Sequence, residues 1–368
     1  MKFIKFSPLA WAGAAVLLAL LVIPAADVYY ESSWGQGCAR CHEIKGNYDV
    51  WQKSAHRKVN CTSCHSSSFQ TNLRRVSTHM NGEAPERIHL KGEDAVAMIE
   101  KCRSCHQQEF AQWKAGPHST TFAKIFIDNE HNRKRLLMDD CLRCHGMHFE
   151  GSIKDVVQPL NTKGPWQLTD VKLVNRPAIP CLACHSMHRE GEPMMKGETR
   201  VGAKQEILRP SIGLFDRRAQ ENIRAGMLPV PVMYDGTRAV KMSPDRRQAL
   251  CYQCHAPLAN MQIGSGDDRT PMGVHEGLSC LACHQKHGQF TRQSCADCHP
   301  RLSNCGLDVE KMDTTFANPK SKHNVHWVKC ADCHPKGVPR KRAAIAGTNL
   351  PGDRPGGSAA FALRAGQH

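Results

Sequence analysis

Large aromatic side chains are scarce in this chain of 368 residues, because Phe, Trp and Tyr make up only 6% of it. Aromatic side chains dominate the energetics of most protein cores, so a core built from side chains alone would be poor here. Beyond the N-terminus the sequence also lacks an apolar run of the roughly 20 residues that cross a bilayer. The shortage of aromatic side chains predicts an interior filled by something other than side chains.

Cysteine and histidine are abundant instead, with 19 and 21 copies. Eighteen of the cysteines fall into nine copies of the pentapeptide Cys-x-x-Cys-His, where chance at this composition would give roughly 0.06 copies. The pattern is the attachment signature of c-type haem: two thiols form thioethers with one haem, and the adjacent imidazole ligates its iron from the proximal side. The sequence therefore predicts nine covalently attached haem c groups.

Each predicted attachment site contributes two cysteines and one histidine. A disulfide framework would suit an exported chain but needs no His after every second Cys, and zinc sites pair two Cys-x-x-Cys units, whereas nine units cannot pair off. The predicted attachment cysteines are Cys38, Cys41, Cys61, Cys64, Cys102, Cys105, Cys141, Cys144, Cys181, Cys184, Cys251, Cys254, Cys280, Cys283, Cys295, Cys298, Cys330 and Cys333. The predicted proximal iron ligands are His42, His65, His106, His145, His185, His255, His284, His299 and His334.

The N-terminus carries an export signal. Lys2 and Lys5 precede an apolar run over residues 9–23, which small residues follow at Ala25 and Ala26. This order is typical of a secretory signal peptide, and the run is also at the short end of what spans a bilayer. A cleaved signal and a retained inner-membrane anchor both stay open. In either case we expect the rest of the chain in the periplasm.

The formal net charge of +15 has an explanation that does not involve nucleic acid. Each ferric haem brings about −1 once its two propionates are counted, so nine haems bring about −9 and leave the oxidised protein near +6. The basic side chains are then counter-charges for propionates. We predict no nucleic-acid partner.

The spacing of the motifs divides the chain. Residues 1–27 form the signal peptide or anchor, 28–188 a five-haem region, 189–248 a connector rich in Pro and Gly, 249–335 a four-haem region and 336–368 a basic, disordered tail. Short helices are expected to lead into motifs over 93–101, over 128–138 and after Ser243-Pro244-Asp245. The predicted fold is mainly α with extensive loops and little or no β, organised around the haems.

Second iron ligands are sought among the histidines outside the motifs. His148, His188 and His287 each stand three residues after a proximal His, a spacing that places both imidazoles on one side of a helical turn. Such a His cannot reach the far face of its own haem, so we expect it to ligate a neighbouring haem. His89 and His131 are interpreted as spare, and His368 lies in the tail. The candidate distal ligands are His56, His79, His118, His148, His188, His275, His287, His323 and His326.

Three sulfur-containing residues leave alternatives open. Met147 and Met187 stand two positions after a proximal His, where a thioether is an axial ligand or packs against porphyrin. Cys305 is the cysteine outside the motifs. It is a buried thiol, an intermolecular disulfide partner or an iron ligand.

Over about residues 38–334 these motifs resemble the multihaem cytochrome c superfamily. The segment 38–65, with Tyr48, Trp51 and His56, is similar to tetrahaem cytochromes of nitrification and to membrane-anchored quinol dehydrogenase cytochromes. The repeated Cys-Leu-x-Cys-His-x-Met-His is similar to decahaem cytochromes held inside outer-membrane porins. The chain departs from these groups: Ile44 stands where the quinol dehydrogenases have Met, and there are nine motifs rather than ten.

The resemblance implies transfer of electrons between a quinol-linked membrane donor and a periplasmic or outer-membrane acceptor in anaerobic respiration. The implied partners are redox proteins, among them a quinol-linked inner-membrane complex or an outer-membrane porin–cytochrome. The alternative is an oxidoreductase acting on a small nitrogen or sulfur compound at one five-coordinate haem. The Cys-x-x-Cys-Lys motif of pentahaem nitrite reductases does not occur in this sequence. We therefore predict an electron-transfer protein with no catalytic residue.

Overall fold

The protein is described from a computed structural model of residues 1–368. The predicted proximal ligand His334, the predicted attachment residue Cys298, the spare His89, Cys305 and the tail beyond residue 336 lie outside the described residues. The described residues are 7–65, 69–83, 90–188, 211–256, 269–284, 287, 295, 299, 309–314, 318, 320–321, 323–333 and 335–336.

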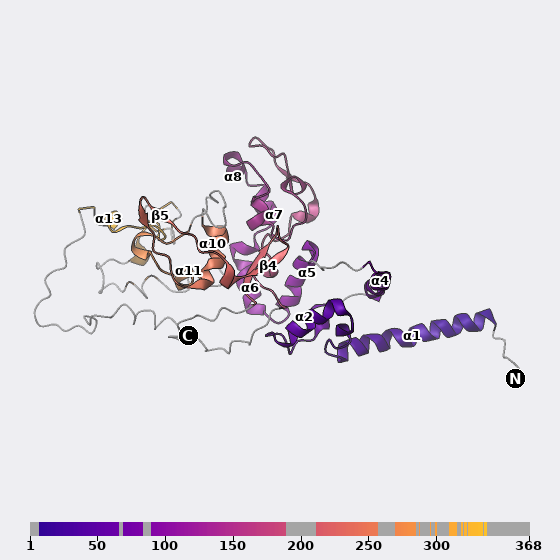
Figure 1. Ribbon diagram of the computed structural model, residues 1–368. Helices are drawn as coiled ribbons and strands as arrows, with labels where there is room; N and C mark the ends of the chain where they lie inside the picture. Colours follow the sequence, from indigo (N-terminus) through magenta and orange to yellow (C-terminus); the bar gives the residue numbers. More distant parts are fainter. Residues whose placement is uncertain are drawn as a thin grey trace, which may run out of the picture.

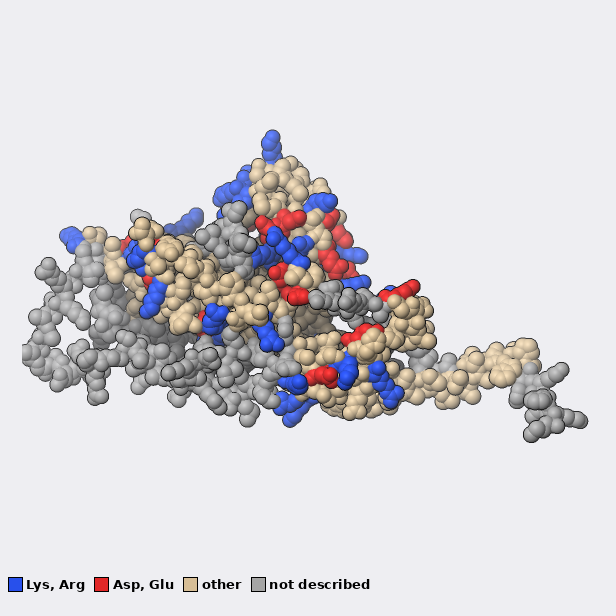
Figure 2. Space-filling view, in the orientation of Figure 1, with Lys and Arg blue, Asp and Glu red and all other residues tan. Residues whose placement is uncertain are grey.

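The N-terminal helix α1 (Pro8–Ser32) projects away from the rest of the chain (Figure 1). Its span Trp11–Ser32 has a mean hydropathy of 2.0, and among the described residues it is the one helix long and apolar enough to cross a membrane. Figure 2 shows it as an almost uncharged rod beside a body that carries acidic and basic side chains. Signal peptide and membrane anchor both agree with this helix.

Short helices follow in the N-terminal region. They are η1 (Cys38–Arg40), α2 (His42–Gln52), α3 (Cys61–Cys64), α4 (Phe69–Met80), α5 (Gly92–Arg103) and α6 (Gln107–Ala115). The Asn60 side chain caps α3 by accepting a hydrogen bond from the Thr62 N–H, which satisfies an otherwise unpaired donor at the helix start. Helix α5 confirms the helix predicted over 93–101 and carries the next motif at its C-terminal end.

One side-chain core lies in the lobe over residues 117–183. Its elements are η2 (Pro117–Ser119), α7 (Phe122–Phe126), α8 (Asn129–Lys134), α9 (Cys141–His145), η3 (Ile153–Asp155), β1 (Val157–Gln158), β2 (Gln167–Leu168), η4 (Val171–Leu173) and η5 (Cys181–Ala183). Phe122, Phe126, Leu142, Val156 and Trp166 pack together in its interior. Burying each such side chain stabilises the fold by about 1.5–3 kcal/mol. Helix α8 is shorter than the helix predicted over 128–138 because its last turn is followed by extended backbone at Arg135.

Residues 211–248 were expected to form a connector, but their described structure is more ordered than that. It comprises the hairpin β3 (Gly213–Asp216) and β4 (Glu221–Arg224), then η6 (Ala225–Met227), β5 (Tyr234–Asp235), β6 (Arg238–Ala239) and η7 (Arg246–Gln248). Strand β3 pairs antiparallel with β4, with Leu214 opposite Ile223. Leu214 and Phe215 are buried against Ala183 and Ala249. Apolar side chains at the start of β3 therefore fold this stretch onto the haem-binding segments, while residues 189–210 lie outside the described residues.

The described residues of the C-terminal region include several short helices. They are α10 (Ala249–His255), η9 (Gly273–His275), α11 (Cys280–Cys283), η10 (Val309–Lys311) and α13 (Cys330–Cys333). The Asp245 side chain caps the turn before α10 by accepting a hydrogen bond from the Arg247 N–H. Gly273 has a φ of +67°, and a side chain at this position would collide with the Val328 carbonyl. Glycine is therefore required where the backbone at residue 273 approaches the backbone at residue 328.

These elements confirm the predicted fold class. Helices outweigh strands, and the described strands form three two-stranded antiparallel sheets. Long loops connect the pieces.

Candidate haem-binding site

Most described motifs begin a short helical turn at their first cysteine. In five of them the His backbone N–H donates to the carbonyl of that cysteine, as from His65 to Cys61 at 2.8 Å and from His185 to Cys181 at 3.0 Å. Such a turn gathers residues i, i+3 and i+4 on one side. Both thiols and the imidazole of a motif therefore point the same way, as attachment of one haem requires. The sixteen motif cysteines from Cys38 to Cys330 whose side chains the structure describes are free thiols rather than disulfides.

Seven of the motif histidines lie against a second histidine from another part of the chain. Two imidazoles that ligate one iron from opposite faces have ring centroids about 6.3 Å apart, since a metal–imidazole bond is about 2.0–2.1 Å long. The observed separations run from 5.5 to 6.3 Å, so these residues fit haem iron. The pairs are His42–His79, His106–His56, His65–His188, His255–His118, His185–His287, His299–His275 and His284–His326.

The second histidine of a pair comes from the neighbourhood of a different motif. His188, three residues after His185, stacks on His65 at 5.8 Å. His287, three residues after His284, lies 6.0 Å from His185. His188 and His287 therefore each connect the motif that they follow to another motif.

Thiols of different motifs also lie side by side. A hydrogen bond with Cys181 raises the pKa of the Cys102 thiol, and a hydrogen bond with Cys251 raises the pKa of Cys280. Burial raises the pKa of Cys184 to about 11. The third and fifth motifs are thus neighbours, as are the sixth and seventh.

Burial keeps several of the second histidines neutral, which is the form that ligates a metal. Burial lowers the pKa of His118, and the nearby His255 lowers it further. Burial lowers the pKa of His188, with His65 adding to the shift. Burial also lowers the pKa of His56, and the nearby His106 lowers it further.

His148 has different surroundings from His188 and His287, the other two histidines that stand three residues after a motif histidine. Its ring stacks on Phe215 with centroids 3.9 Å apart, it is 5% exposed, and both of its ring nitrogens are buried without a hydrogen-bond partner among the described residues. Burial lowers its pKa to about 4. His323, another candidate, also has a buried Nδ1 without such a partner. Ligation by these two residues, like ligation by the seven pairs, stays a prediction.

A carboxylate that sequence reasoning missed adjoins the first pair. Glu43 follows His42 directly, and its Oε1 lies 2.6 Å from Nδ1 of His79. Its own backbone N–H lowers the pKa of the carboxyl, and the His79 hydrogen bond lowers it further. The available signal was an acidic residue at the start of a helix, directly after a motif histidine.

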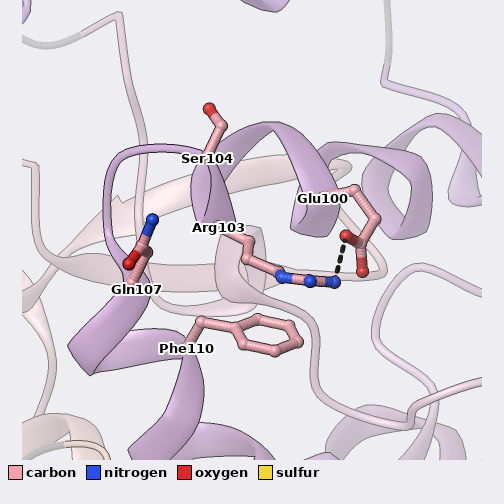
Figure 3. Close-up of a pocket in the computed structure, with 5 residues that line it drawn as sticks. All are labelled: Glu100, Arg103, Ser104, Gln107 and Phe110. Carbon is pink, nitrogen blue, oxygen red and sulfur yellow. Dashed lines mark hydrogen bonds and ion pairs between the residues drawn. The ribbon is translucent and has the colours of Figure 1, made fainter.

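A hollow of about 550 Å³ lies beside the third motif (Figure 3). The Arg103 guanidinium donates a hydrogen bond to the Glu100 carboxylate at 2.9 Å. The same guanidinium lies over the Phe110 ring, with 5.2 Å between its carbon and the ring centroid. An aromatic face and a guanidinium next to Cys102 and Cys105 suit a porphyrin edge and its propionates.

Two family models match parts of the chain. The model for cytochrome c554 and c-prime matches residues 101–186, which contain three motifs. The model for cytochrome c7 and related cytochrome c matches residues 235–300, which contain three further motifs. No curated protein and no solved structure matches the chain.

Proposed function

We propose that this chain, which is a multihaem c-type cytochrome, is a periplasmic nonahaem carrier. It moves electrons along a row of haems from a quinol-linked membrane donor to a periplasmic or outer-membrane acceptor in anaerobic respiration. The haem, when bound, supplies reversible one-electron chemistry at its iron. The chain's own residues attach it, ligate it and set the distance to its neighbours.

The observation that carries this proposal is the set of seven imidazole pairs. An iron held between two histidines has no position for a substrate, so such a site transfers electrons and does not bind a small molecule. We assign the motif histidine of each pair as proximal ligand and the second histidine as distal ligand. His148 and His323 remain the candidates for the other two irons.

Contacts between motifs support a continuous path. Gly35 approaches the Cys61 Sγ closely beside the first motif, and His56, just before the second motif, pairs with His106 of the third. Cys102 contacts Cys181, which connects the third motif to the fifth. The path therefore follows spatial neighbours rather than the order of motifs in the sequence.

The membrane end of the path lies at the first two motifs. Helix α1 ends at Ser32, six positions before Cys38, and its last turn packs onto the haem-binding body. The Asn60 side chain donates to the Glu31 carbonyl, and the Arg40 guanidinium lies 5.4 Å from the Tyr29 ring centroid. These contacts support a retained anchor rather than a cleaved signal. Sequencing the N-terminus of the mature protein from the membrane fraction tests this.

Electron paramagnetic resonance of the oxidised full-length protein tests the function. We expect only low-spin ferric signals. Mass spectrometry should give a mass that exceeds that of the processed chain by nine haems. A mass that corresponds to eight haems would mean that one motif does not attach haem. A high-spin signal that shifts when nitrite or hydroxylamine is added would instead favour the oxidoreductase.

A further inference from the structure

Helix α4 presents a row of exposed apolar side chains. Leu73, Val76 and Met80 are 58%, 53% and 79% exposed. They stand at positions i, i+3 and i+7 of one helix, so they lie along the same face of it. Because each of them is more than half exposed, no described part of the chain covers this face.

The position of α4 is set by contacts that lead back to the end of α1. The ring of His79, in the last turn of α4, has its centroid 5.5 Å from that of His42, the first residue of α2. Helix α2 follows η1, whose Arg40 guanidinium lies 5.4 Å from the ring centroid of Tyr29 in α1. Figure 1 shows α4 and α1 on the same side of the haem-binding body.

Aromatic residues mark the end of the apolar span. Tyr29 and Tyr30 in the last turn of α1, and Trp34 just after it, are exposed. Such rings, apolar in the body and polar at the tip, gather where a bilayer meets water. The span Trp11–Ser32 therefore meets the bilayer surface at these residues, and the contacts through α2 and η1 hold α4 close to the same surface.

The charge of α4 suits phospholipid. Arg74 and Arg75 stand between Leu73 and Val76, and the helix contains no acidic residue. Arg74 is exposed, and a guanidinium forms strong charge-assisted hydrogen bonds with phosphate. Apolar residues on one face with arginine beside them are typical of a helix that lies in the boundary between headgroups and acyl chains.

We propose that α4 is a second membrane contact, with Leu73, Val76 and Met80 inserted into the surface of the bilayer that α1 spans. Phospholipid is the occupant of this face, because the face continues the aromatic boundary at the end of α1 and carries basic rather than acidic side chains. The inference rests on the proposed retention of α1 as an anchor. A single span lets the body tilt about its end, whereas two contacts fix which side of the body faces the membrane.

Photolabelling of the full-length holoprotein tests this proposal. The protein is placed in vesicles of phosphatidylethanolamine and phosphatidylglycerol, in which some lipid carries a carbene-forming group near the glycerol, and labelled peptides are mapped by mass spectrometry. We expect label on α1 and on the peptide that holds Leu73, Val76 and Met80. Val171, an exposed apolar residue of the lobe, should stay at background. An α4 peptide that also stays at background overturns the proposal.

Val76→Asp shows whether the apolar row itself makes the contact. We expect the labelling of α4 to fall by about tenfold, because a carboxylate is costly to place among acyl chains. The label on α1 and the haem spectrum should match those of wild type. Labelling of α4 that is unchanged in this variant would overturn the role of the row.

Val171→Asp is the matched control, since it makes the same substitution at an exposed apolar position of the lobe. We expect it to leave the labelling of α4 as in wild type. Equal losses in the two variants would show a general effect of charge on vesicle binding and would overturn a specific role for α4.

Sequencing the N-terminus of the same sample separates this inference from the proposed anchor. If α1 is present and labelled while α4 is not, the anchor stands and the α4 contact fails. If α1 has been cleaved and α4 is still labelled, the anchor fails and the lipid contact stands. A dimer whose α4 is protected from lipid label, detected by analytical ultracentrifugation, would assign the face to a second copy of the chain and would overturn the proposal.

Discussion

Residues 121–173 enclose a continuous apolar core, whereas the helices η1, α2 and α3 between Cys38 and Cys64 bury no residue at all. In the first region Phe122, Phe126 and Trp166 exclude water from the interior. In the second, histidine rings face one another across gaps of 5.5 to 6.1 Å. A chain short of aromatic residues still forms side-chain cores in this lobe and beside β3, and we infer that the region over 38–64 depends on haem for its stability.

Haem removal should have the largest effect and should separate the two regions. Without the attachment machinery, the chain cannot bury enough apolar area at 38–65 to offset its conformational entropy. We expect the haem-free chain as a whole to be unstable, with cleavage first within 38–65 and last within 121–173. Limited proteolysis with mass spectrometry of the fragments measures this order. A compact haem-free chain that resists protease throughout would contradict it.

Loss of a core aromatic should damage the lobe by an ordinary packing mechanism. Phe126 is 0% exposed, and Phe126→Ala should cost about 3–5 kcal/mol in the free energy of unfolding. Urea unfolding followed by circular dichroism measures the change. Leu136→Ala is the control, because Leu136 is 51% exposed and should shift stability by no more than about 0.5 kcal/mol. Similar losses in both variants would show that this lobe has no specific core.

Removing one tethered imidazole should alter one iron and little else. His188→Ala removes the ring that faces His65, so the affected haem should be the one attached at Cys61 and Cys64 rather than at the adjacent motif. We expect one high-spin iron that binds carbon monoxide when reduced, with nine haems still attached. In the control His131→Ala every iron should stay low-spin. A wholly low-spin His188→Ala protein would refute the assignment of this pair.

The smallest effect is expected at a turn within the lobe. Asp155 accepts hydrogen bonds from the Ser152 N–H at 2.8 Å and the Ser152 hydroxyl at 2.7 Å, and these lower the pKa of its carboxyl below the usual 3.8. Because the folded pKa is depressed, the stabilisation is complete above about pH 4 and is lost as pH falls through the lowered pKa.

Asp155→Asn should therefore lower the melting temperature slightly at pH 7. The difference from wild type should shrink as the pH falls below about 4, which thermal melts across that range measure. Ser152→Ala should produce a similar loss, and the double variant should show less than the sum of the two. A difference that persists unchanged at pH 2 would mean that charge plays no part.

Much of the fold class could be read from the sequence, because the motifs themselves impose short helical turns. Helix α5 matches the helix predicted over 93–101, and it ends in the third motif as expected. The hairpin β3–β4 was missed because each strand has only four residues and its apolar side chains do not alternate along a longer run. Its burial depends on contacts with Ala183 and Ala249, which no local pattern reveals.

The candidate haem-binding site, like the fold, could be predicted from the sequence only in part. Iron ligation stays a prediction, but the sequence itself determined which atoms come together within each motif, since Cys-x-x-Cys-His places two thiols and an imidazole on a single turn. Only the tertiary structure decided which second imidazole faces each motif histidine, as His188 faces His65 and His56 faces His106. Spacing along a chain fixes neighbours within a turn. A partner across a 6 Å gap depends on how separate segments pack, and that packing is set by the whole molecule.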